Sequence, residues 1–285
     1  MVKSAPQMLM NEPIDYLIIG HVSKDIVPNG YKIGGTAAYS GRTAHILGCR
    51  TAVLTSATAD FDLAAALPGI QFHRVPAAQN TTFDNIYTEN GRSQILHSIA
   101  APLTPAHVPA QWQRAPIVHL GPIASEIDPA IVNLFSNSLI GLTPQGWLRR
   151  WDADGRVYAR DWEAAAAILP QAAAVIISEE DLLHDAMLAQ YRRWSRLLVL
   201  TRGRQGCTVF LGDESRDVPA LRVPEVEFTG AGDIFAAAYF VRLWQTGGNP
   251  WESARFANEI AAQSVTQPDL ESKMEQVSKL QVANK

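Results

Sequence analysis

One segment of the chain combines glycines with a carboxylate in a pattern that can do chemistry. It reads Thr229-Gly230-Ala231-Gly232-Asp233, and it opens a strongly apolar stretch with helical spacing. Glycines let the backbone approach a phosphate group closely, and the free N–H groups of a first helical turn attract anions. The segment is therefore a candidate anion-binding turn.

Asp233 places a negative charge in this turn. A carboxylate would repel a bound phosphate unless a substrate hydroxyl lay between the two groups. In that arrangement Asp233 would accept the hydroxyl proton as a general base while a phosphoryl group is transferred. The alternative is structural, because an acidic residue in the first turn also stabilises a helix. The segment alone does not separate the two interpretations.

Two other phosphate-binding patterns fit the sequence worse. A dinucleotide fingerprint needs a third glycine three residues after Gly232, and that position is Phe235. A P-loop needs a glycine followed by Lys-Ser or Lys-Thr, and the chain has no such run. The patterns argue against a Rossmann dinucleotide site and against a Walker-type NTPase.

Short apolar runs alternate with helix-like segments, which predicts an α/β fold with a parallel sheet covered by helices. An extended stretch around Leu221 to Phe228 is expected to be a strand that leads into the glycine turn. The expected strands are Tyr16 to Ile19, Ala52 to Thr55, Ile117 to Leu120, Ala174 to Ile177 and Leu197 to Thr201. The expected helices are Thr36 to Leu47, Asp161 to Leu169, Glu179 to Gln190, Asp233 to Gln245 and Trp251 to Thr266.

Two strand-like segments, Thr81 to Thr88 and Ser93 to Ile99, flank Asn90-Gly91, a pair that favours a tight hairpin turn. A hairpin inserted around residues 80–100 would be a lid over a site, or it would extend the edge of the main sheet. No linker or repeat divides the chain, and the polar last fifteen residues are its one tail-like segment. We expect a single domain over residues 1–285, whose lid could also cap a neighbouring subunit's site in a homodimer.

Composition narrows the classes of partner. The 285 residues are 47% hydrophobic, and 24 basic and 28 acidic residues give a net charge of −4 without a basic block, which argues against nucleic acid. No run reaches the ~18 apolar residues of a membrane span, and no secretory signal is visible, so a cytoplasmic protein is expected. The seven histidines and two cysteines have no metal-ligand spacing, so no structural metal is expected.

The glycine–aspartate run resembles the C-terminal signature of the ribokinase-like, or PfkB-type, carbohydrate kinases. The similarity extends over nearly the whole chain. It also includes Gly20 to Asp25 with Gly34-Gly35, Leu200-Thr201-Arg202-Gly203 with Gly206, and Ala257-Asn258 with Ser264-Val265-Thr266. In this family the first region contacts the substrate. The second forms the turn on the nucleotide side, and the third is the helix beside the nucleotide base.

The resemblance implies a three-layer sandwich with a mostly parallel central sheet and a small β lid. It implies transfer of a phosphoryl group from ATP, with Mg²⁺ arriving with the ATP, to a hydroxyl of a sugar or polyol. Asp233 would be the catalytic base, and Gly230, Ala231 and Gly232 would form the anion hole. The substrate side would comprise Asp25, Gly34, Gly35, Tyr39 and Gln145, and the nucleotide side Thr201, Arg202, Gly203, Gly206, Thr229 and Asn258.

Two departures from the family pattern concern cations. Glu227 stands where the family commonly has the Asp that is tied to monovalent-cation binding, which leaves a need for potassium open. Ser178-Glu179-Glu180-Asp181 aligns with a family motif that organises Mg²⁺ and phosphates, so Glu180 and Asp181 would act on the metal indirectly. The same four residues also form a capping box, in which Ser178 and Asp181 would satisfy N–H groups at a helix start.

Two further departures concern the acceptor. Tyr39 replaces an Asn that sugar kinases usually place in the first helix, and Gln145-Gly146-Trp147-Leu148-Arg149 resembles a run of the inositol-kinase-like branch. The resemblance therefore favours a cyclic polyol, although Trp147 could be core packing and Gln145-Gly146 a simple turn. A nucleoside kinase and a catalytically weak sugar- or polyol-binding sensor remain as alternatives.

Overall fold

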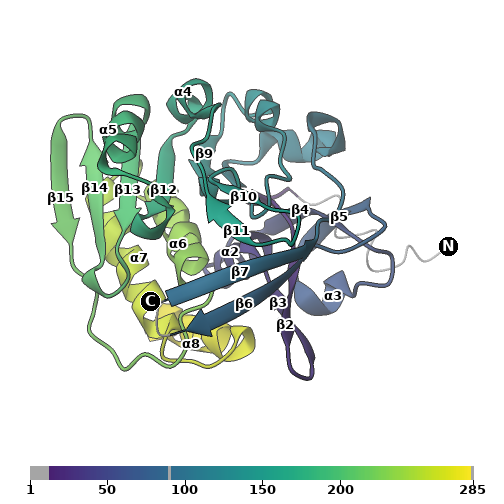
Figure 1. Ribbon diagram of the computed structural model, residues 1–285. Helices are drawn as coiled ribbons and strands as arrows, with labels where there is room; N and C mark the ends of the chain where they lie inside the picture. Colours follow the sequence, from purple (N-terminus) through teal and green to yellow (C-terminus); the bar gives the residue numbers. More distant parts are fainter. Residues whose placement is uncertain (1–12, 89–90, 284–285) are drawn as a thin grey trace.

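The computed structural model describes residues 13–88 and 91–283. Its centre is a nine-stranded sheet with helices on both faces, and a separate four-stranded sheet projects from it (Figure 1). The large sheet has the strand order β15-β14-β13-β12-β9-β8-β1-β4-β5. The strands from β13 to β5 are parallel, and β14 and β15 add an antiparallel edge.

All five predicted strands belong to this sheet, because buried apolar runs need neighbours on both sides. The nine strands are β1 (Tyr16–Ile19), β4 (Thr51–Ala57), β5 (Gln71–Pro76), β8 (Ile117–Leu120), β9 (Leu139–Leu142), β12 (Ala174–Ser178), β13 (Leu197–Thr201), β14 (Cys207–Leu211) and β15 (Glu214–Val218).

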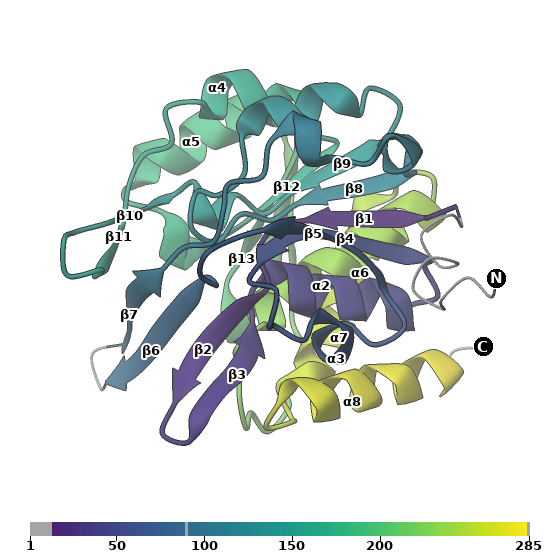
Figure 2. The same ribbon diagram turned by 90° about the vertical axis from the view of Figure 1, so that its right-hand side faces the viewer.

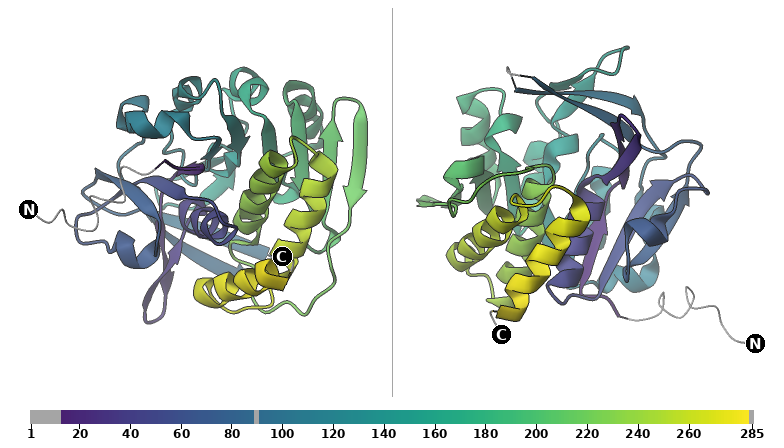
Figure 3. Two further views of the ribbon diagram at one scale, coloured as in Figure 1. Left: turned by 180° about the vertical axis from the view of Figure 1, so that it is seen from behind. Right: turned by 90° about the horizontal axis from the view of Figure 1, so that it is seen from below.

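Helices form a layer on each face of the sheet (Figure 2). One layer contains α2 (Thr36–Ile46), α3 (Leu63–Ala66), α6 (Ala231–Gln245), α7 (Pro250–Ser264) and α8 (Leu270–Ala283). Figure 3 shows α6, α7 and α8 on this face from behind. The other layer contains α4 (Ala165–Ile168), α5 (Asp185–Trp194) and 3₁₀ helices such as Ala110–Arg114 and Pro129–Leu134.

The hydrophobic core divides in the same way. Tyr16 and Ile18 of β1 pack with the α2 and α6 layer, whereas Leu17 and Ile19 pack on the opposite face. This alternation follows from the two-residue period of a strand. The predicted three-layer α/β sandwich is confirmed.

The four-stranded sheet is a lid built from two segments of the chain. It has the order β3-β2-β6-β7, with β2 (Ser23–Val27), β3 (Gly30–Gly34), β6 (Thr82–Thr88) and β7 (Gly91–Ser98). The predicted hairpin consists of β6 and β7, and its strand β6 pairs in parallel with β2. The hairpin therefore does not extend the main sheet. The expected lid around residues 80–100 is only half of the sheet, and Asn90 of the predicted turn lies outside the described residues.

Two predicted helices are shorter than expected. The segment Glu179 to Gln190 contains a 3₁₀ turn, Glu179–Asp181, and a separate helix α5 that begins at Asp185. The side chain of His184 accepts a hydrogen bond from the N–H of Met187, which starts the second helix afresh. The expected helix Asp161 to Leu169 is reduced to α4, followed by the 3₁₀ turn Leu169–Gln171 around Pro170.

Two expectations near the C-terminus are wrong. The stretch Leu221 to Phe228 is not a strand, because Pro224 lacks an N–H and the N–H groups of Val226 and Glu227 bond to the carbonyl of Val265. The polar last fifteen residues are largely a helix, α8, whose buried Leu270, Met274 and Val277 recur at helical spacing.

The remaining short elements surround the strand ends. A two-stranded sheet, β10 (Arg149–Trp151) with β11 (Val157–Ala159), lies between the lid and the helical layer of α4 and α5 (Figure 1). The other 3₁₀ turns are Pro105–His107, Pro144–Gly146 and Gly203–Gln205. Among the helices of the described ranges, none is both long enough and apolar enough to cross a bilayer.

Candidate functional site

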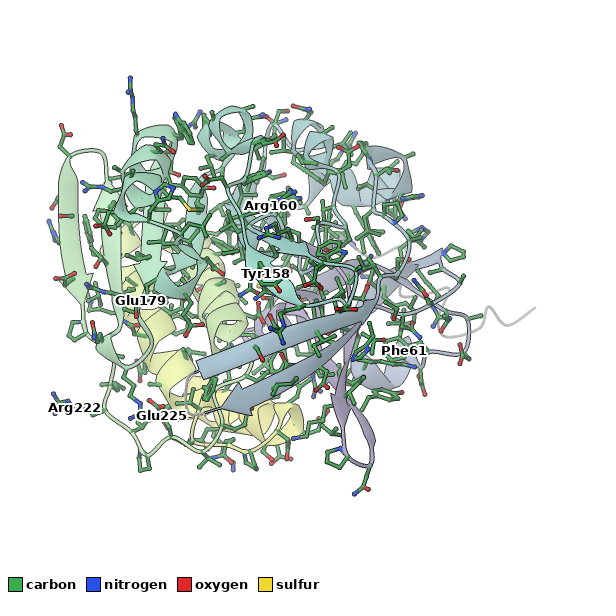
Figure 4. The ribbon with its side chains drawn as sticks, in the orientation of Figure 1. Phe61, Tyr158, Arg160, Glu179, Arg222 and Glu225 are labelled. Carbon is green, nitrogen blue, oxygen red and sulfur yellow. The ribbon has the colours of Figure 1, made fainter. Side chains whose placement is uncertain are left out.

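The predicted site residues gather beyond the carboxyl ends of the parallel strands. Gly20 follows β1, Gln145 follows β9, Asp181 follows β12 and Arg202 follows β13. Open α/β sheets bind ligands at this edge. In Figure 4 the side chain of Glu179 lies here, above the loop that carries Arg222 and Glu225.

The glycine turn starts helix α6 as the sequence predicts. Gly230 is the residue before the helix and has a φ of +77°, and a Cβ there would lie 2.2 Å from the ring of Tyr39. Only glycine meets both conditions. Among the described residues outside its own helical turn, none has a heavy atom within 4 Å of the position that a Cβ on Gly232 would take, so α6 is open at Gly232. Asp233 is the acidic residue of that turn.

Asp25 and Asp233 each contact the short segment Gly34 to Thr36, where β3 ends and α2 begins. The carboxyl group of Asp25 covers Gly34, where a Cβ would lie 2.6 Å from its atoms. The hydroxyl of Thr36 donates a 2.7 Å hydrogen bond to Oδ1 of Asp233. Two carboxylates from opposite ends of the sequence therefore face the segment from Gly34 to Thr36.

Gly35 is a close-approach position between these contacts. Its φ is +88°, and a Cβ would lie 2.4 Å from the carbonyl oxygen of His21. The loops on either side are held by buried Glu126, whose carboxylate accepts N–H groups from His21, Ile123 and Ala124 at 2.7 to 3.1 Å. The ends of β1 and β8 are thus fixed around the start of α2.

Tyr39 lies against the glycine turn, the candidate anion-binding turn. Its side chain is buried, and its ring packs against Gly230. The hydroxyl of Ser40, the next residue of α2, donates a 2.9 Å hydrogen bond to the backbone carbonyl of Asp233. Helix α2 therefore supports the turn from behind, and a contact of Tyr39 with substrate stays a prediction.

Gln145, Gly146 and Trp147 form the turn after β9. A Cβ on Gly146 would lie 2.5 Å from the backbone nitrogen of Ile123, which explains the glycine. Trp147 is buried, stacks on Trp162 with 4.5 Å between ring centroids, and donates its indole N–H to a backbone carbonyl. The core-packing interpretation of Trp147 is correct. The contact of half-buried Gln145 with substrate stays a prediction.

The turn after β13 is built by Thr201, Arg202, Gly203 and Gly206. Gly206 has a φ of +90°, and a Cβ there would lie 2.2 Å from the carbonyl oxygen of Val218. The guanidinium of Arg202 donates a 2.6 Å hydrogen bond to Asp217. Hydrogen bonds from Thr208 and Arg202 lower the pKa of the Asp217 carboxyl. Arg202 thus has a protein partner, and its contact with a nucleotide stays a prediction.

A pocket of about 540 Å³ lies between β15 and α7. Asn258 lines it, but its amide donates a 2.9 Å hydrogen bond to the carbonyl of Val218 and so also holds the wall together. The position beside α7 is where a nucleotide base was expected. The other lining residues are Arg216, Asp217, Val218, Pro219, Leu221, Trp251, Arg255 and Glu259.

The run after β12 is a capping box. The hydroxyl of Ser178 accepts the N–H of Glu180 at 3.2 Å, and a carboxylate oxygen of Asp181 accepts the N–H of Ser178 at 3.1 Å. Asp181 therefore has a structural role, and an indirect action of Asp181 and exposed Glu180 on Mg²⁺ stays a prediction. Within the described ranges no cluster of three or more potential metal-ligating side chains occurs.

The sequence reasoning missed Thr36 and Lys273. Thr36 directly follows the two glycines, which marks it as a residue at the site. Lys273 lies on the buried face of α8, and its ammonium contacts oxygens of Glu227 and Thr229. The helical spacing of Leu270, Met274 and Val277 could have predicted α8, but no local signal names the partners of Lys273.

Comparison with known proteins agrees with this geometry. The model of the pfkB family carbohydrate kinases matches residues 153–276. Inositol 3-kinase from Oryza sativa subsp. japonica is 26% identical over 94% of this chain and 73% of the relative. Fructokinase-1 from Zea mays is 34% identical over 29% of this chain, and the match spans about a quarter of the fructokinase, 27% of its length.

Solved structures share the fold. A pyrophosphate-dependent kinase in the ribokinase family, complexed with a pyrophosphate analog and myo-inositol, has a TM-score of 0.78 at 21% identity and covers 92% of this chain and 98% of its own. Ribokinase from Giardia lamblia has a TM-score of 0.74 at 18% identity and covers 96% and 100%. The molecule thus has the ribokinase-like fold. The match to the pfkB family carbohydrate kinases lies in residues 153–276, the part of the chain that carries the glycine–aspartate signature.

Proposed function

We propose that the protein transfers a phosphoryl group to a hydroxyl of a small cyclic polyol of the inositol type. The observation that carries the proposal is that Asp25 and Asp233 both contact the segment Gly34–Thr36, beside the first turn of α6. One carboxylate can bind acceptor hydroxyls while the other stands next to an anion-binding helix start.

We assign residues to phosphoryl binding, to proton acceptance and to orientation of the base. The phosphoryl oxygens approach the backbone at Gly230 to Gly232, where the helix dipole stabilises the charge that develops during transfer. Asp233 accepts the proton of the attacking hydroxyl, which is worth ~10² to 10⁴ in rate. Thr36 donates to Oδ1 of Asp233 and so fixes the carboxylate for this role.

The acceptor is proposed from two kinds of support. The Gln145-Gly146-Trp147-Leu148-Arg149 run resembles the inositol-kinase-like branch, and the rice inositol 3-kinase aligns over nearly the whole chain. A structural neighbour was also solved with myo-inositol. A nucleoside acceptor and a binding-only sensor are the competing readings, and the assay below separates them.

ATP with Mg²⁺ is the proposed donor because of the pocket between β15 and α7. Trp251 offers an aromatic face in this pocket, with the guanidinium of Arg216 stacked on its ring at 4.3 Å from the centroid. A purine base can use such a surface. Pyrophosphate is the second candidate, since the structural neighbour with myo-inositol depends on it. That donor would need the anion-binding turn but not the pocket.

The test is a product assay with every donor and acceptor pair. Purified protein is incubated with Mg²⁺, either ATP or pyrophosphate, and inositols, pentoses, hexoses or nucleosides, and the phosphorylated product is identified by mass spectrometry. We expect product from an inositol. Binding of an inositol without product from any donor would favour the sensor and refute the kinase.

Three variants sharpen the assay. Asp233→Asn should lower kcat by ~10² to 10⁴ because the general base is lost. Asp185→Asn is the matched control, because Asp185 is an exposed first-turn carboxylate on α5 and shares only the structural role. Equal, small effects of both would refute the base assignment. Trp251→Ala should raise KM for ATP and leave KM for pyrophosphate unchanged.

A further inference from the structure

Lys273 of α8 places a cation directly behind the anion-binding turn. Its side chain is completely buried, and Nζ lies 2.7 Å from the carbonyl oxygen of Glu227, 2.9 Å from Glu227 Oε2 and 2.8 Å from the carbonyl oxygen of Thr229. A lysine ammonium has three N–H donors, so each finds one oxygen. The segment that supplies the oxygens ends at the residue before Gly230.

The ammonium and the carboxylate of Glu227 depend on each other. Burial lowers the pKa of Lys273, and the hydrogen bond and charge of Glu227 oppose that effect. Burial would raise the pKa of Glu227, but hydrogen bonds from Thr229 and Lys273 outweigh it and lower the pKa. An unpaired charge at either place would be costly. The pair therefore stays ionised and keeps the segment in one conformation.

Helix α8 holds Lys273 in place by contacts away from the turn. Leu270, Met274 and Val277 of α8 pack into the core. The carboxylate of Glu271 accepts a 2.6 Å hydrogen bond from Arg42 of α2, the helix that also carries Thr36. The ammonium of Lys273 is thus fixed relative to α2 and to the turn that starts α6.

We propose that Lys273 is a positioning residue that serves as a built-in monovalent cation. Its ammonium fills an oxygen cage formed by Glu227 and Thr229, holds the anion-binding turn in its geometry, and cancels a carboxylate that would otherwise repel the phosphoryl donor. This inference rests on the proposed function. It follows that the reaction needs no monovalent cation from solution, and that removing the ammonium creates a need for one.

The test compares Lys273→Ala with Lys273→Met in buffers whose only monovalent cation is tetramethylammonium, too large for the cage. Wild-type kcat should be unchanged when ammonium or K⁺ is added. Lys273→Ala should lose about 10²-fold in kcat, as misplaced catalytic groups do, and recover when ammonium or K⁺ enters the vacated space. Lys273→Met should lose activity without recovery, because its side chain fills that space.

The control is Lys279→Ala, which removes an exposed lysine from the same helix and should behave as wild type. A purely structural role of Lys273 would lower Tm without a cation-specific recovery of kcat, and would overturn the proposal. Stimulation of the wild type by K⁺ would also overturn it, and that measurement does not depend on any variant folding.

Pyrophosphate affinity separates this inference from the proposed function. Calorimetry with pyrophosphate and Mg²⁺ reports the anion-binding turn even if no acceptor is phosphorylated. Absence of product from the wild type would refute the kinase. Weaker pyrophosphate binding by Lys273→Ala that ammonium restores would still support the role of Lys273, and unchanged binding would refute it.

Discussion

Thr36 links the start of α2 to Asp233, and Thr36→Val tests what that hydrogen bond does. Valine keeps nearly the same shape, so the methyl group that packs against Gly121 is retained while the hydroxyl donor is lost. Thr36 is only 2% exposed, so water has little access to replace the hydroxyl. The charged form of the Asp233 carboxylate should therefore be less stable in the variant.

The size of the effect follows from the hydrogen bond. A hydrogen bond to a charged group is worth about 1.5–3 kcal/mol. Since 1.36 kcal/mol corresponds to one pH unit, the acid limb of the pH–rate profile should move to higher pH by about 1–2 units. Above that limb Asp233 is ionised again, so kcat there should return close to the wild-type plateau.

The assay is the pH dependence of kcat and kcat/KM at saturating donor. Thr36→Ser is the matched control, because it keeps the hydroxyl and should keep the wild-type acid limb. If the limb of Thr36→Val coincides with that of the wild type, the charge of Asp233 does not control the rate. The reasoning that makes Asp233 the base would then be refuted.

Two further predictions concern stability. Burial lowers the pKa of His119 to about 3, whereas a histidine in the unfolded chain titrates near ~6.5. Between these two pH values the unfolded chain binds a proton that the folded protein does not. The free energy of unfolding should therefore decline by at most ~1.4 kcal/mol per pH unit as the pH falls from ~6.5 to about 3. Urea unfolding at several pH values should show this slope flattened in His119→Gln, and an unchanged slope would contradict it. Gly230→Ala should lose about 1–2 kcal/mol from its positive φ, plus the clash with Tyr39, whereas Gly232→Ala should lose less because it meets no neighbour. Equal losses in thermal unfolding would contradict the assigned geometry.

The sequence is a good guide to elements whose pattern is local and strong. The strands β1, β8 and β13 have the predicted bounds, because each is a buried apolar run between polar or turn residues. The glycine turn and the start of α6 were predictable because a positive φ at Gly230 demands glycine. Periodicity and backbone sterics act within a few residues, so both can be read from the sequence.

The sequence is a poorer guide where the competing interactions are close in energy or distant in the chain. A capping box at Ser178 and a second cap at His184 divide one helical pattern into two elements. The bond from Val226 to the carbonyl of Val265 replaces a strand that Leu221 to Phe228 was expected to form. Partners that are tens of residues apart leave no trace in either segment alone.

The same limit applies to the site. The types of residue were readable, since Asp25, Asp233 and the glycines carry the family signature. Their mutual placement was not, because Thr36 reaches Asp233 across 197 positions of the chain, and Lys273 reaches Glu227 across 46. Prediction from sequence therefore finds the proposed reacting groups before it finds the residues that hold them.

The departures from the family pattern now have physical partners, and this bears on whether the protein is a catalyst. Tyr39 packs against Gly230, and Glu227 pairs with buried Lys273. Both positions contact the glycine turn or the segment that leads into it, while Asp233 and the glycines keep the signature. A protein that only binds a polyol has no need for a glycine turn that can bind phosphate and has a carboxylate beside it. The altered positions therefore favour a phosphotransferase over a sensor.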